Sequence, residues 1–186
     1  FQLANWCGTC PAMFQRLSDT VTADAEIVTE RLNSGLEAID RDVLDVYGRV
    51  LPRSRYTVLL QDMTPQLVRP GDPSDYFVHE QVATWGIDPA VGRPESPVTD
   101  YYRTFEAPVA GRGHLYEFAV PMVPPAWNVR ERVDEYRQDA GVEVATAVAY
   151  SLLDIVQPAM DEGVDYYEHW VLTHFLLDGH HKCEAA

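Results

Sequence analysis

The chain has 186 residues, of which 46% are hydrophobic and 23% charged, a balance that can fill one core of ordinary size. Its 14 Lys and Arg residues against 29 Asp and Glu residues give a net charge of −15, which repels phosphate backbones and anionic lipids. We therefore expect no nucleic-acid partner and no membrane partner. No apolar run approaches the roughly 18–20 residues of a membrane-spanning helix and no secretion signal is apparent, so we expect a cytoplasmic protein. We expect a single domain over residues 1–186, in which residues 1–52 can form an N-terminal helical lobe.

Cys7 and Cys10 are separated by two residues, and the intervening Gly8 lets both thiolates face one point. Zinc needs about four ligands, and the other soft donors are concentrated near the C-terminus. If the two ends of the chain meet, His174 and Cys183 are the expected partners in a zinc site. The alternative is that both N-terminal cysteines are small buried side chains.

The segment Asn5–Pro11, with the sequence Asn-Trp-Cys-Gly-Thr-Cys-Pro, resembles the active site of the thioredoxins. That resemblance implies thiol–disulfide exchange by Cys7 and Cys10. A thioredoxin also needs a strand before the motif, whereas only five residues precede Trp6 here. The spacing of the two cysteines leaves the zinc, redox and buried-thiol interpretations open.

From Thr20 to Leu51 the pattern is helical, because apolar residues recur at spacings of three and four and Pro52 follows. The run Tyr56–Leu60 suits a buried strand or a short helix equally well. Ten of the thirteen prolines lie between Pro65 and Pro125, which excludes long helices there. Because aromatic residues are interspersed among them, we expect an ordered wrapping segment rather than a linker.

One strand is expected within the proline-rich segment, over His114–Val120. Asn128 followed by Glu131 resembles a capping box, and the polar helix that it starts ends near Gly141. Residues 142–156 alternate as a strand does, although their alanine content also allows a helix. The sequence therefore predicts an α+β fold, with a mixed sheet, flanking helices and a long proline-rich wrapping segment.

The C-terminal segment carries the strongest functional signal. Residues 168–177 are aromatic and apolar, Asp178 and Gly179 follow, and then a helix begins with His180. We expect a strand, a tight turn with Asp178 as the helix N-cap, and outward-facing amides beside Lys182. Unpaired donors next to a lysine favour anions, and phosphate is the natural candidate.

The sequence Leu177-Asp178-Gly179-His180-His181-Lys182 resembles the Asp-Gly-His-His/Arg-Arg/Lys box of the ParB/sulfiredoxin-like superfamily. In that superfamily the box binds nucleotide phosphates. The resemblance implies that Gly179, His180, His181 and Lys182 hold the phosphates, with ATP or ADP and Mg²⁺ as the cofactors. His180 stands where sulfiredoxins carry their catalytic cysteine, so sulfinic-acid reduction is not expected.

Three functional hypotheses follow. The first is a nucleotide- or phosphate-binding protein, leaning to a small-molecule phosphotransferase, with a metal site at Cys7 and Cys10. Asp178, His180, His181 and Lys182 are its candidate catalytic residues, because the lysine can hold phosphate and the others can accept a proton. The second is a noncatalytic, zinc-stabilised protein-interaction module. The third is a thioredoxin-like oxidoreductase.

Overall fold

We describe a computed structural model of the chain. The residues that it describes are 3–4, 13–14, 25–69, 71–76, 100–109, 111, 113–123, 127–139, 145–156 and 168–186. The chain separates into two compact units, residues 1–62 with 140–146 and residues 63–139 with 147–186. Within the described residues, no helix is long and apolar enough to cross a membrane.

The first unit contains a two-stranded antiparallel sheet and two helices. The strands are β1 (Leu3–Ala4) and β2 (Met13–Phe14), and the helices are α1 (Ala25–Ser34) and α2 (Arg41–Val50). The segment predicted to be helical over residues 20–51 therefore contains two helices, α1 and α2. Gly35, which directly follows α1, has a φ of 80°, a conformation that ends a helix readily.

Asp40 begins α2 by accepting hydrogen bonds from the backbone amides of Asp42 and Val43. After α2, the prediction of a strand or helix over Tyr56–Leu60 is wrong. These residues have no regular structure and are mostly exposed, because no neighbouring strand pairs with them in the described part of the chain.

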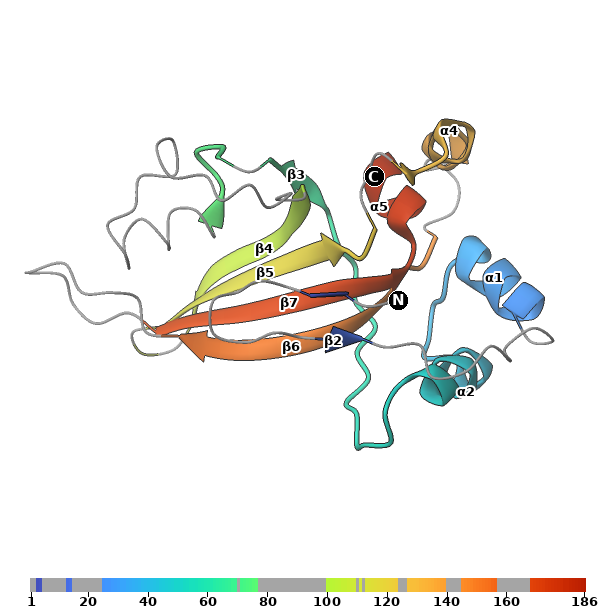
Figure 1. Cartoon of the computed structure of the whole chain (residues 1–186), viewed down its shortest axis with the longest axis horizontal. Helices are drawn as coiled ribbons and strands as arrows, with labels where there is room; N and C mark the ends of the chain where they lie inside the picture. The colour runs from blue at the N-terminus through green and yellow to red at the C-terminus, as the bar shows by residue number, and fades with distance from the viewer. Residues whose placement is uncertain are drawn as a thin grey trace, which may run out of the picture. The chain divides into compact units, whose positions relative to one another are not determined.

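The second unit is built on a five-stranded mixed sheet with the order β3-β4-β5-β7-β6. Figure 1 shows the four long strands side by side, with α5 at the end of β7 and α4 beside it. The elements are β3 (Gln66–Val68), β4 (Tyr101–Val109), β5 (Gly113–Pro121), α4 (Arg130–Asp139), β6 (Val148–Val156), β7 (Glu168–Asp178) and α5 (His180–Ala185).

The strand pairing explains why the sheet is mixed. β5 and β7 run parallel, whereas the pairs β3–β4, β4–β5 and β6–β7 are antiparallel. The predicted α+β class with a mixed sheet is therefore confirmed. Residues 77–99, a large part of the proline-rich wrapping segment, lie outside the described residues.

Both faces of the sheet are packed. One face carries a core of Val68, Tyr76, Tyr101, Phe118 and Val171. The other carries Tyr102, Ala119 and Leu176, against which Cys183 of α5 packs. Adjacent residues such as Tyr101 and Tyr102 lie on opposite faces of the sheet, because successive side chains of a strand point in opposite directions.

The strands predicted over 114–120 and 142–156 are present as β5 and β6, although β6 begins only at Val148. The expectation of one strand in the proline-rich segment is wrong, because β3 and β4 also lie there and pair with each other beside β5. The predicted polar helix is α4, but it is not capped as expected. Asn128 donates its side-chain amide to Glu184 of α5 instead, and Val133 of α4 is fully buried. α4 therefore packs one side against α5 through Val133 and Tyr136, while most of its other residues are exposed.

Candidate functional site

The turn between β7 and α5 has the predicted order of strand, glycine and helix. Gly179 occupies the N-cap position with a φ of 94° and no side-chain capping bond, so the expectation that Asp178 caps the helix is wrong. The first bond within the helix runs from the Cys183 amide to the Gly179 carbonyl (2.9 Å). The backbone amides of residues 180–182 therefore make no hydrogen bond within the helix, as is true of the first amides of any helix.

Close packing explains why this turn uses glycine. A Cβ atom on Gly179 would lie 2.5 Å from the Ala147 Cβ and 2.9 Å from the Ala147 Cα. Ala147 therefore packs directly against the backbone of the turn, and no space is left there for a side chain at position 179.

The two histidines that follow the turn accept hydrogen bonds from backbone amides of the segment between β5 and α4. His180 Nε2 accepts a hydrogen bond from the Met122 amide (3.1 Å), and His181 Nε2 accepts one from the Val129 amide (3.1 Å). Accepting from an amide requires an unprotonated nitrogen, so both rings are neutral with the proton on Nδ1. Burial lowers the pKa of His180, which favours the same neutral form. These two rings fix the segment that leads from β5 to α4.

Lys182 lies at the turn but is not openly exposed. Its side chain is 9% exposed, with Nζ 3.5 Å from Asp178 Oδ2 and 5.9 Å from the centre of the Tyr136 ring. Burial lowers the pKa of Lys182, and the Asp178 carboxylate opposes that shift. The Asp178 side chain is 43% exposed, so the ion pair has one buried member and one member that solvent reaches.

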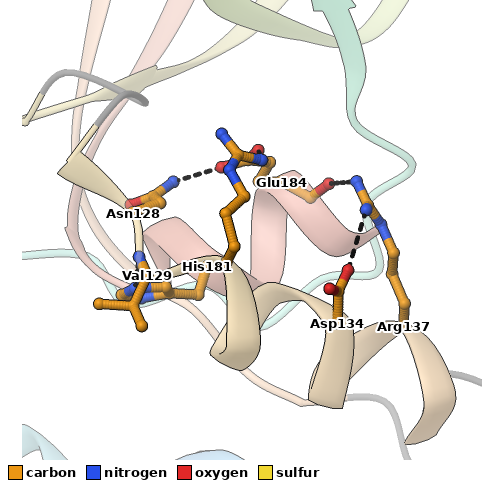
Figure 2. A network of polar contacts seen from close by, with 7 residues as sticks. Asn128, Val129, Asp134, Arg137, His181 and Glu184 are labelled. Carbon is orange, nitrogen blue, oxygen red and sulfur yellow. Dashed lines mark hydrogen bonds and ion pairs between the residues drawn. The ribbon is translucent and has the colours of Figure 1, made fainter.

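Glu184 anchors α5 to α4. It accepts hydrogen bonds from Asn128 (2.7 Å) and from Arg130, while Arg137 donates to its carbonyl oxygen and contacts Asp134. Figure 2 shows Asn128, Asp134, Arg137 and Glu184 where α4 and α5 meet. Burial alone would raise the pKa of Glu184, but the Asn128 and Arg130 hydrogen bonds outweigh it and lower the pKa. The carboxylate is therefore a structural group held in its charged form.

His174, the expected metal ligand on β7, is engaged at both ring nitrogens. Nε2 lies 2.8 Å from Glu117 Oε1 and Nδ1 lies 2.7 Å from Ser151 Oγ. These partners come from β5 and β6, and no local motif in the sequence links them to His174.

The remaining expected metal ligands are dispersed or outside the description. Cys183 is a free, half-buried thiol whose pKa burial raises to about 11. Cys7 and Cys10 lie outside the described residues. Within the part of the chain that is described, no three His, Cys, Asp or Glu side chains gather as a metal site would require. The zinc site and the thiol-exchange site both stay predictions.

No protein-family model matches the chain, and searches of curated proteins and of solved structures find no match. The resemblance of residues 177–182 to the ParB/sulfiredoxin-like box therefore stays a prediction as well.

Proposed function

We propose that the β7–α5 turn binds the phosphate groups of a small ligand, with ADP and ATP as the first candidates. One observation carries this proposal. The tightly packed Gly179 turn holds the Lys182 ammonium 3.5 Å from the half-exposed carboxylate of Asp178, which an anionic ligand can replace as a partner.

The histidines support this arrangement indirectly. Because His180 and His181 are both held neutral by backbone amides, neither adds a second positive charge to the turn. Their part in phosphate binding is to fix the residues around the turn. Lys182 is then the cation that meets the ligand.

The proposal extends to phosphotransfer onto a hydroxyl compound, with Asp178 as the base. Asp178 is the exposed carboxylate of the turn, whereas Nε2 of each histidine is already an acceptor. Asp178 would take the proton of the attacking hydroxyl, whose oxygen bonds to phosphorus while the nucleotide diphosphate leaves. Mg²⁺ bound with the nucleotide would neutralise charge on the phosphates.

Two variants with opposite expected effects test the binding site. Lys182→Met keeps the buried stem and removes the charge, so it should weaken ADP binding about tenfold or more, measured by calorimetry without Mg²⁺. Asp178→Asn removes the competing carboxylate and should tighten ADP binding by about threefold to fivefold. The same variant should abolish ATP consumption in the presence of acceptor hydroxyl compounds.

Asp154→Asn is the matched control, since Asp154 is an exposed carboxylate on β6 and its loss changes the net charge equally. It should alter ADP affinity only slightly. Equal ADP affinity in the wild type, Lys182→Met and Asp178→Asn would overturn the proposal.

A nucleotide ligand and a free thiol at Cys183 support the further proposal of a cytoplasmic location. The net charge of −15 supports a small-molecule ligand over nucleic acid.

A further inference from the structure

Three side chains from three neighbouring strands form a continuous hydrogen-bonded chain on one face of the sheet. Glu117 of β5 contacts His174 of β7 (2.8 Å), and His174 contacts Ser151 of β6 (2.7 Å). The register places Ser151 directly opposite His174, which is why their side chains emerge on the same face. This group is separate from the β7–α5 turn and is not needed for phosphate binding.

The serine is exposed and the other two residues are buried, which is the distribution that nucleophilic catalysis requires. The His174 and Glu117 side chains are 6% and 10% exposed, whereas Ser151 is exposed. A buried carboxylate and imidazole keep their mutual geometry, because neighbouring side chains restrict their rotamers. The serine hydroxyl is the member that a substrate can reach.

The contacts allow one direction of proton movement that suits catalysis. With Glu117 as an ionised carboxylate, which only accepts, the His174 proton lies on Nε2. Nδ1 is then the unprotonated nitrogen, and it accepts from the Ser151 hydroxyl. The arrangement is a nucleophile, a base and a group that orients the base, which is the pattern by which serine nucleophiles are recognised on unrelated folds.

The surface beside Ser151 is apolar. Leu153 and Ile155 follow it at alternate positions of β6, on the same face, and are 52% and 57% exposed. Phe105, which pairs with Glu117 in the register of β4 and β5, is also exposed on this face. A substrate with an apolar acyl or aryl group would find contact area next to the hydroxyl.

We propose that Ser151, His174 and Glu117 form a second active site that hydrolyses carboxylic esters with apolar acyl groups. Ser151 Oγ bonds to the ester carbonyl carbon as His174 Nδ1 takes the hydroxyl proton. The bond to the alcohol oxygen breaks, and the alcohol leaves with that proton. Water, activated by the same nitrogen, then releases the acid and regenerates the serine. Glu117 is a positioning residue that stabilises the imidazolium.

The test uses the full chain with a fluorophosphonate probe and with p-nitrophenyl butyrate. The probe should label Ser151, as located by peptide mass spectrometry. The rate of p-nitrophenol release from the ester should fall about 100-fold or more in Ser151→Ala. Ser54→Ala, which changes an exposed serine of the first unit, should leave labelling and hydrolysis unchanged.

Glu117→Gln separates a catalytic role from a structural one. It should lower kcat about tenfold or more with little change in KM, slow the labelling of Ser151 and alter the pH profile of kcat. If this variant does not fold, Ser151→Ala decides alone, because its exposed site tolerates the loss of one hydroxyl. No labelling of Ser151 in the wild type, or equal hydrolysis by wild type and Ser151→Ala, would overturn the proposal.

Discussion

Replacing Gly179 with alanine tests the two physical reasons why the β7–α5 turn uses glycine. Its φ of 94° is a conformation that costs a residue with a side chain about 1–2 kcal/mol. The added Cβ would also lie 2.5 Å from the Ala147 Cβ and 2.9 Å from the Ala147 Cα. Because a backbone atom is among these contacts, the clash can be removed only if the backbone moves. Such overpacking costs about 1–3 kcal/mol. We expect Gly179→Ala to lower the free energy of unfolding by about 2–5 kcal/mol.

Gly111→Ala is the matched control, because Gly111 has a φ of 88° but an added Cβ would meet nothing within 4 Å. It should show the conformational cost alone, about 1–2 kcal/mol. Both glycines belong to the second unit, so one urea transition, followed by tryptophan fluorescence and circular dichroism, reports on both variants. The difference between the two losses isolates the packing cost against Ala147. Equal losses in the two variants would show that the turn is not packed as described.

Three further predictions concern other parts of the molecule. Burial lowers the pKa of His180 below its ordinary value of 6.5, so its neutral form stabilises the fold above that pH, and the contribution is lost as the pH falls through the lowered pKa. Thermal unfolding between pH 8 and pH 5 should show this loss, and His180→Gln should reduce it. Asp40→Ala should lower the free energy of unfolding of the first unit by about 1 kcal/mol, measured in urea, since it removes the N-cap of α2; an unchanged midpoint would contradict the capping role. Tyr101→Phe should lower the free energy of unfolding of the second unit by about 1–3 kcal/mol in urea, because the Tyr101 hydroxyl donates to the buried Asp75 carboxylate and accepts from the Tyr76 amide; a loss below about 0.5 kcal/mol would contradict these hydrogen bonds.

The C-terminal turn was the most predictable part of the site, because its signals are local. An apolar run followed by Asp178 and Gly179 predicts a strand that ends in a turn, and the structure has that order. Assigning the N-cap to Asp178 was wrong, because Gly179 itself occupies the N-cap position. Its left-handed conformation is one that glycine adopts readily. The roles of His180 and His181 depend on Met122 and Val129, which are more than fifty residues away, so no local pattern could reveal them.

Tyr56–Leu60 illustrates the limit of residue preference. Its side chains favour a strand, but a strand forms only where another strand offers hydrogen bonds, and none does so among the described residues. By contrast, His114–Val120 forms a strand because β4 and β7 lie on either side of it.

The sequence by itself determined some of the local elements, namely the helical pattern before Pro52, the strands β5, β6 and β7, and the glycine turn between β7 and α5, but it missed β3 and β4 in the proline-rich segment. These features depend on periodicity, on proline and glycine, and on contacts between near neighbours in the chain. Only the tertiary structure decided which side chains meet, because alternation assigns a residue to a face of a strand but not to a neighbour across the sheet. Glu117, Ser151 and His174 come together through the order and register of three strands, and Lys182 is paired and buried because α5 folds back beside α4.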